Sequence, residues 1–362
     1  MTPLFVDADI RKASTLPSEF YTHPDYFKAS AEKIFSKFWH FIGDTDELRL
    51  SNSLLPVTLL PGFMDEPILF TRDKEDAIHC LSNVCTHRGN LLVEHPCSEQ
   101  QQIRCRYHGR RFDLSGKFRH MPEFEEVENF PSEKDHLPSL PWGRWERLLF
   151  ASIKPASGLD DVFKEMKQRV SFLPLREFKP DPSRSRDYLV KANWALYCEN
   201  YLEGFHIPFI HQSLNNVIDY NSYSTELYSH SSLQLALAKG GEDEFDLPPG
   251  SPDYGKQVGA YYFWVFPNMM FNFYPWGLSI NIIKPMGPSL TKVSFLTYIH
   301  DETRLDSGAG QLLDKVERED EAVVENVQKG IQSRLYHQGR YSPKRETGTH
   351  HFHRLIAHYM NQ

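Results

Sequence analysis

CTHRG at residues 85–89 and CRYHG at residues 105–109 are the two segments that decide how this 362-residue chain is interpreted. Each segment supplies one thiol and one imidazole; the four side chains are Cys85, His87, Cys105 and His108. A glycine ends each segment, and glycine permits the tight loops that bring backbone N–H groups close to a bound cluster. The pattern predicts two loops that meet at one metal centre.

Two cysteines and two histidines in this order form the ligand set of a Rieske [2Fe–2S] cluster, in which imidazoles replace two thiolates on one iron. A structural zinc ion is the alternative, but the common zinc pattern places two Cys in one arm and two His in the other. Because imidazole is neutral, it raises the reduction potential of the cluster. We therefore expect a centre that accepts and passes on electrons.

The two arms resemble Rieske domains over Cys-Thr-His-Arg-Gly and Cys-x-Tyr-His-Gly-x-x-Phe-Asp-x-x-Gly. In the Rieske proteins of cytochrome complexes a disulfide braces the loops, but the corresponding positions here are Asn90 and Tyr107. The resemblance therefore points to the oxygenase or ferredoxin type. One departure is Arg110, where many oxygenases of the family carry Trp. The other cysteines show no paired pattern, which fits a reducing compartment.

Length and composition suggest two domains of a cytoplasmic protein. The net charge of −8 argues against a nucleic-acid partner, which would require a basic face. No apolar run approaches the roughly 20 residues of a membrane span, and no secretory segment is evident at the start. We expect a helical lead at residues 1–39, a cluster domain at 40–153 and a second domain at 154–362.

The periodicity predicts an α+β protein. Short apolar runs cut by Gly, Pro and Asn predict an all-β cluster domain. In the second domain, strand-like runs at 261–267, 269–274, 278–285 and 291–300 precede a long helix at 311–335. An antiparallel sheet with long helices of this kind is a helix-grip arrangement.

The second domain carries its own set of candidate metal ligands. His206 and His211 would diverge by about 140° on an unbroken helix. Pro208 disfavours continued helix at the residue before it, so His211 is free to come from a fresh turn. Asp320 falls on the apolar stripe of the long helix, whereas Glu319 lies roughly 100° away. A carboxylate there needs either a metal or a buried basic partner.

A cluster domain followed by Glu-x3-Glu-x2-His-x4-His at residues 199–211 resembles the α subunit of Rieske non-haem iron oxygenases, the ring-hydroxylating dioxygenase superfamily. The resemblance implies that His206, His211 and Asp320 bind mononuclear iron. It also implies that Glu203 links a cluster histidine of one subunit to an iron-ligand histidine of the next. Most aromatic-ring dioxygenases carry Asp at that position, and Glu resembles the quaternary-amine (choline, carnitine and glycine-betaine) monooxygenases.

The resemblance implies an oxygenase component that uses O2 and electrons from NAD(P)H, delivered by a separate flavin/iron–sulfur reductase. The expected reaction is monooxygenation or N-demethylation of a small quaternary ammonium compound, and the expected assembly is a homotrimer. An aromatic-ring-hydroxylating dioxygenase, a pure Rieske electron carrier and a helix-grip ligand-binding module remain alternatives. We expect the pocket wall to draw on the aromatic side chains of Tyr261, Phe263, Phe271, Phe273, Tyr274 and Trp276.

Overall fold

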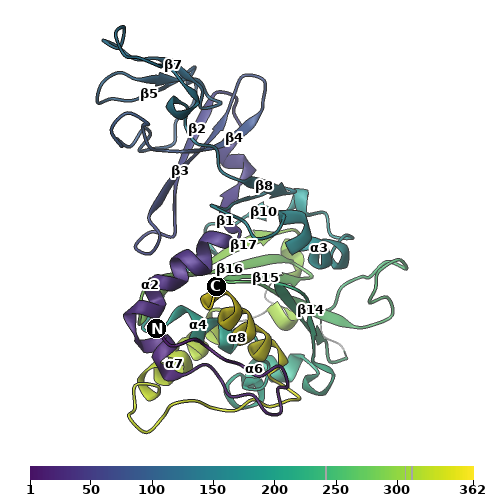
Figure 1. The fold of residues 1–362 in the computed structure, drawn as a ribbon. Helices are drawn as coiled ribbons and strands as arrows, with labels where there is room; N and C mark the ends of the chain where they lie inside the picture. The colour runs from purple at the N-terminus through teal and green to yellow at the C-terminus, as the bar shows by residue number, and fades with distance from the viewer. Residues whose placement is uncertain (241–242, 306, 311–312) are drawn as a thin grey trace. The chain divides into compact units, whose positions relative to one another are not determined.

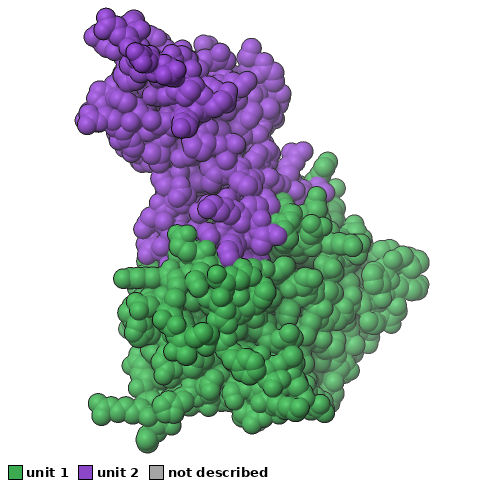
Figure 2. Space-filling view, viewed as in Figure 1, with its two compact units in different colours: residues 1–35, 157–362 green, residues 36–156 purple. Residues whose placement is uncertain are grey.

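The computed structural model describes residues 1–240, 243–305, 307–310 and 313–362. It divides into two compact units, residues 36–156 and residues 1–35 together with 157–362. Figure 2 colours these units separately. No helix in the described part of the chain is both long enough and apolar enough to cross a bilayer.

The unit of residues 36–156 is built from short antiparallel strands. They form three small sheets, in the orders β1-β9-β8, β2-β3-β4 and β5-β6-β7. The strands are β1 (His40–Asp44), β2 (Ser53–Leu59), β3 (Glu66–Arg72), β4 (Ile78–Ser82), β5 (Ile103–Arg104), β6 (Arg111–Phe112), β7 (Phe118–His120), β8 (Trp142–Trp145) and β9 (Leu148–Ala151). The segment 85–89 follows β4, and the segment 105–109 connects β5 to β6. The predicted all-β domain is confirmed.

The second unit is organised around one antiparallel sheet. Its strand order is β10-β17-β16-β15-β14-β13-β12, and β11 also pairs with β17. The strands are β10 (Lys179–Pro180), β11 (Arg186–Val190), β12 (Ser224–Leu227), β13 (Ser231–Leu237), β14 (Val258–Val265), β15 (Met269–Tyr274), β16 (Gly277–Gly287) and β17 (Leu290–Ile299). The four predicted strand runs correspond to β14 through β17, which supply the centre of the sheet.

Helices cover both faces of this sheet (Figure 1). They are α1 (Ser18–Thr22), α2 (Pro24–Lys33), α3 (Leu159–Arg169), α4 (Trp194–Tyr201), α5 (Ile207–Ile210), α6 (Gln212–Val217), α7 (Leu313–Gly330) and α8 (Thr347–Met360). Phe163 of α3 packs edge-on against Phe271 of β15, whereas Phe352 of α8 packs against Trp264 of β14. Alternate strand residues point to opposite faces, so α3 and α8 lie on opposite sides of the sheet. The predicted α+β class is confirmed.

The first residues of the chain fold with the last ones. Leu4 donates its N–H to the side chain of Asn361 at 2.9 Å, and Ser14 forms an isolated β-bridge with Arg340. The predicted long helix is α7, which begins at Leu313 and ends at Gly330 in the described part of the chain. Residues 311 and 312, the first two of the predicted helix, lie outside the described residues.

Candidate metal centres and substrate pocket

The two cluster segments form loops with the same backbone hydrogen bonds. In each loop the cysteine carbonyl accepts a bond from the glycine four residues later, and the cysteine N–H donates to the carbonyl five residues later. These bonds are Gly89 N to Cys85 O (3.0 Å), Cys85 N to Asn90 O (2.9 Å), Gly109 N to Cys105 O (3.0 Å) and Cys105 N to Arg110 O (2.8 Å). Both glycines have left-handed backbone, with φ of 70° and 76°. A side chain at either position would strain the loop.

The four predicted cluster residues come together at these loops. Cys85 and Cys105 are buried, and the rings of His87 and His108 lie edge-on with centroids 4.8 Å apart. Among the described residues, the buried Nδ1 atom of His108 has no hydrogen-bond partner. A buried nitrogen without a partner is costly, and an iron bond would satisfy it. The residues therefore fit a [2Fe–2S] cluster.

No disulfide links the two loops in the described part of the chain. The five cysteines, all within the described residues, are free thiols. Asn90 follows the first loop, and Tyr107 lies inside the second with an exposed ring. The arrangement agrees with the expectation that this is not the disulfide-braced type of Rieske protein.

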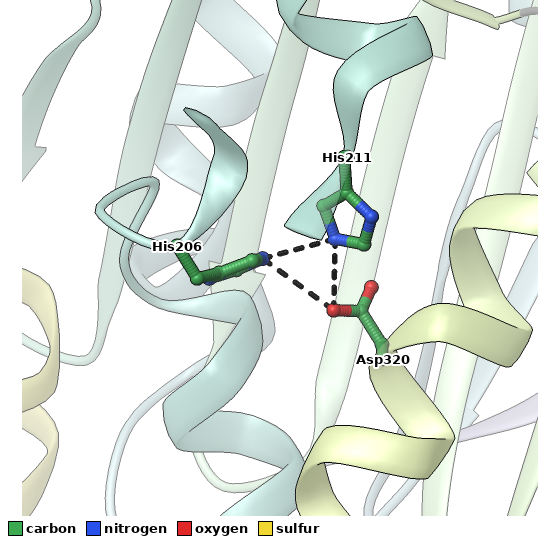
Figure 3. Close-up of side chains that lie close together, drawn as sticks. All are labelled: His206, His211 and Asp320. Atoms are coloured by element: carbon green, nitrogen blue, oxygen red, sulfur yellow. Dashed lines mark hydrogen bonds and ion pairs between the residues drawn. The ribbon is translucent and has the colours of Figure 1, made fainter. Parts of the chain in front are cut away.

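His206, His211 and Asp320 form a tight triangle in the second unit (Figure 3). The two Nε2 atoms lie 3.1 Å apart, and Oδ1 of Asp320 is 3.4 Å from Nε2 of His206 and 3.0 Å from Nε2 of His211. Within the described ranges, no other group of three His, Cys, Asp or Glu side chains gathers so closely. Two imidazoles and one carboxylate on one side of a metal leave positions open for O2, as in non-haem Fe(II) oxygenases.

Pro208 explains how residues 206 and 211 reach the same point. It stands in the first turn of the four-residue helix α5, with His206 at the N-cap and His211 at the C-cap. A new helix, α6, begins directly after His211. The interruption lets both rings converge, as the sequence predicted. Asp320 reaches them from α7, more than a hundred residues further along the chain.

Two carboxylates orient the histidine rings by contacting their Nδ1 atoms, on the side of each ring opposite the triangle. Oε1 of Glu203 lies 2.7 Å from Nδ1 of His206, and Oε2 of Glu319 lies 2.8 Å from Nδ1 of His211. Carboxylate partners of this kind fix the tautomer of a metal-binding histidine and raise its basicity. Sequence analysis singled out Glu203 but missed Glu319. The sequence offered one signal for Glu319, which is its position next to Asp320. Glu319 lies off the apolar stripe of the helix, so the stripe gave no reason to select it.

A small pocket adjoins the triangle. Its wall carries five tyrosines and four side-chain amides: Tyr197, Tyr201, Tyr223, Tyr262, Tyr274, Asn200, Gln234, Asn272 and Asn281. Burial raises the pKa of every one of these tyrosines, which therefore remain neutral. The wall thus offers neutral aromatic faces and polar groups.

The sequence analysis placed most of the pocket wall on the wrong face of the sheet. Of the six aromatic residues expected there, only Tyr274 lines this pocket. Tyr262 of β14 and Asn272 of β15 pair across strands and face the pocket, so their odd-numbered neighbours in those strands face away. Phe271, for example, packs against α3. The aromatic residues identified from sequence are mainly core of the opposite face.

Glu317 gives the pocket a half-buried acid with no basic side chain among the described residues that line this pocket. It lies one turn before Asp320 on α7 and accepts a hydrogen bond from Tyr197 Oη at 2.5 Å. Burial raises the pKa of Glu317 to about 8, with a further contribution from the charge of Asp320. Among the described lining residues there are three acids and neither lysine nor arginine. A cation entering this pocket would favour the ionised form of Glu317.

Comparison with known proteins identifies the class. The sequence matches the Rieske [2Fe–2S] domain over residues 38–131 and the ring hydroxylating alpha subunit catalytic domain over residues 175–362. The chain therefore belongs to the ring-hydroxylating α subunit family of Rieske oxygenases. It contains a Rieske [2Fe–2S] domain and, in His206, His211 and Asp320, a candidate mononuclear iron site.

Individual relatives indicate which branch of the family the chain resembles. It is 30% identical to the chloroplastic choline monooxygenase of Arabidopsis thaliana, over 96% of this chain and 83% of the relative. It is 27% identical to the carnitine monooxygenase oxygenase subunit of Escherichia coli strain K12, over 97% and 95%. An inhibitor-bound quaternary ammonium Rieske monooxygenase has the same fold, with a TM-score of 0.76, 23% identity and coverage of 98% and 99%. The chain is a Rieske-type monooxygenase component related to choline and carnitine monooxygenases.

Proposed function

We propose that this chain hydroxylates a small quaternary ammonium compound; where the hydroxylated carbon is an N-methyl group, its C–N bond breaks and the carbon leaves as formaldehyde. The tyrosine-lined pocket beside the candidate iron site, with the acid Glu317 in its wall, carries the proposal. Quaternary ammonium groups are recognised by aromatic faces through cation–π attraction. A buried carboxylate adds direct charge complementarity. An uncharged aromatic ring, the alternative substrate, has no charge that would favour the ionised form of Glu317.

The pocket further favours a cation that lacks a carboxylate. A carnitine or betaine carboxylate would need a basic partner when buried. Neither Lys nor Arg is among the described residues that line the pocket, whereas Oε1 of Gln234 is buried without a hydrogen-bond partner. A hydroxyl group would satisfy that acceptor. We therefore infer a choline-type amino alcohol.

The residues of the chain have separate roles in this reaction. When bound, the iron supplies O2 activation and the cluster supplies electrons one at a time. The Nε2 atoms of His206 and His211 and a carboxylate oxygen of Asp320 would hold the iron. Glu317 and the tyrosine wall would orient the ammonium group so that one C–H bond faces the open side of the triangle. Buried walls also exclude water from the reacting atoms.

We infer that Glu203 connects the two kinds of centre between neighbouring copies of the chain, in a homotrimer. Its carboxylate contacts Nδ1 of His206 and the backbone N–H groups of Phe205 and His206, and its side chain is 14% exposed. A separate flavin/iron–sulfur reductase would supply electrons from NAD(P)H. The free thiols fit the predicted cytoplasmic location, because reducing compartments keep thiols free.

The test is coupled turnover by the holoenzyme with a surrogate reductase. O2 and NADH consumption and product formation would be measured with choline, glycine betaine, carnitine and a simple aromatic hydrocarbon. We expect product with choline, weaker turnover with the two carboxylates and none with the hydrocarbon. Coupled hydroxylation of the hydrocarbon without turnover of any ammonium compound would overturn the proposal.

Glu317→Gln tests the charge directly. Removing the carboxylate should raise KM for choline by about 10- to 100-fold, as expected for a lost charge-assisted contact of 1.5–3 kcal/mol. Binding of the carbon analogue, in which a neutral tert-butyl group replaces trimethylammonium, should change little. Glu325→Gln, two turns further along α7, is the matched control. Equal loss for both ligands would contradict a charge-recognition role.

A further inference from the structure

Asp135 contacts both cluster loops at once. Its backbone carbonyl accepts a hydrogen bond from Oγ1 of Thr86, in the first loop, at 2.9 Å. The same carbonyl accepts a bond from Nη2 of Arg110, directly after the second loop, at 3.2 Å. Nη2 of Arg110 also reaches Oδ1 of Asp135 at 2.6 Å. One residue outside the loops thus joins the two segments that hold the cluster ligands.

Arg110 is a buried cation. Its side chain is 2% exposed and lies over the rings of Phe112, Phe118 and Phe130, with its guanidinium carbon 4.9–5.7 Å from the ring centroids. Its Nε atom is buried and has no hydrogen-bond partner among the described residues. A guanidinium is costly to bury unless it is paired, and aromatic faces compensate only part of the cost. Burying a charge here costs free energy, which a residue that only filled space would not require.

The two charges of the pair are unequally screened. The Asp135 side chain is 19% exposed, and its second oxygen accepts bonds from the N–H and hydroxyl of Ser132 at 2.7 and 3.0 Å. Water and these donors disperse the negative charge, whereas the guanidinium is surrounded by hydrocarbon. Buried charges are screened much less than exposed ones. The positive charge of the pair is therefore screened less than its negative charge.

The guanidinium belongs to the residue that closes the second cluster loop. Arg110 lies two residues after His108, and its backbone carbonyl accepts a hydrogen bond from the N–H of Cys105 at 2.8 Å. Net charge and hydrogen bonding around a cluster are the protein's means of setting its reduction potential.

We propose that the Arg110–Asp135 pair holds the two cluster loops together and tunes the cluster, with the guanidinium raising the reduction potential and the carboxylate moderating it. Reduction adds an electron, so a nearby positive charge favours the reduced cluster. The hydrogen bonds of the pair link the two loops, as a disulfide does in the disulfide-braced type of Rieske protein. This role is independent of the substrate, so it stands or falls separately from the proposed function.

The test is the midpoint potential of the cluster, measured by spectroelectrochemistry on the holoenzyme. Arg110→Met removes the charge and should lower the potential by 59 mV or more, a tenfold change for one electron. Asp135→Asn leaves the guanidinium uncompensated and should raise the potential. Opposite signs separate tuning by charge from a general disturbance of the loops, which would shift both variants alike.

Three further variants complete the test. Arg119→Met removes the exposed guanidinium that pairs with Asp113 at 2.7 Å and should leave the potential unchanged. Thr86→Val keeps both charges of the pair and should speed loss of the cluster to a chelator without shifting the potential. Arg110→Lys should keep the potential near that of the wild type. If Arg110→Met fails to assemble a cluster, the sign of the Asp135→Asn shift decides. Shifts of the same sign, or none beyond that of Arg119→Met, would overturn the proposal.

Discussion

Glu319 lies 2.8 Å from His211, with one carboxylate oxygen against the Nδ1 atom of the ring. The contact places the ring proton on Nδ1 and leaves the lone pair of Nε2 directed toward Asp320, where the iron would bind. A carboxylate in this position makes the imidazole a stronger electron donor. Glu319 is therefore a positioning residue whose effect passes through His211.

Glu319→Gln should weaken iron binding without removing a ligand. Loss of such a partner typically costs about 10- to 100-fold in metal affinity. The measurement is the Fe(II) dissociation constant of the apo-site in the cluster-loaded enzyme, obtained by titration. Glu325→Gln on the same helix serves as the control. Unchanged affinity in Glu319→Gln would show that the contact does not support the ligand.

Asp320→Ala should abolish mononuclear iron binding and turnover but leave the visible spectrum of the cluster intact. Asp320 supplies the carboxylate of the triangle, whereas the cluster ligands belong to the other compact unit. Iron analysis should therefore fall from three atoms per chain to two. Retained turnover in this variant would remove Asp320 from the ligand set.

Glu203→Ala should keep both metals while separating cluster oxidation from substrate oxidation. The carboxylate contacts His206, and the proposal gives it a second histidine from a neighbouring copy. In single-turnover experiments the reduced cluster should reoxidise slowly and without matching product. Glu203→Asp, which introduces the residue that most aromatic-ring dioxygenases carry, should retain more of the coupling than Glu203→Ala. Fully coupled turnover in Glu203→Ala would contradict a bridging role.

His351 should make the protein sensitive to mild acid. Burial lowers the pKa of His351 in helix α8 to about 4, below its ordinary value of 6.5. The unfolded chain therefore binds the proton first, and stability falls as the pH drops from 6.5 toward 4. At about pH 5 the loss from this group is about 2 kcal/mol.

Urea unfolding midpoints at about pH 7.5 and about pH 5 would measure this effect, which follows proton linkage. His351→Gln should lose less stability on acidification than the wild type. His358→Gln, on the exposed side of the same helix, should behave as the wild type. An identical acid response in His351→Gln and the wild type would show that His351 does not cause it.

Much of the candidate chemistry was accessible from sequence because it depends on short spacings. The cluster arms and the His206–His211 pair each lie within a few residues, and Pro208 indicated how the second pair could converge. Asp320 could be found because a carboxylate on an apolar helical stripe needs a partner. The fold class followed from the period of the apolar residues in each half of the chain.

The pocket wall could not be obtained in this way. Aromatic residues occur on both faces of the central strands, so they did not reveal which face adjoins the metal site, and the amides of the pocket face, such as Asn272 and Asn281, were not used as a signal. Tyr262 and Phe263 are equally plausible candidates until the helices are placed. Glu317 lies one turn before Asp320 and Glu319 lies directly before it, but what each of them contacts became evident only from the packing opposite α7.

Ligand type and spacing alone predicted the metal chemistry, a Rieske cluster and a candidate iron site at His206, His211 and Asp320. The side chains that surround those centres became evident from the packed fold and not from the spacing. Contacts such as Glu319 with His211, and Arg110 with Asp135, join residues whose separation along the chain carries no local signal. They exist because packing of helix, sheet and loop brings each pair within hydrogen-bond distance.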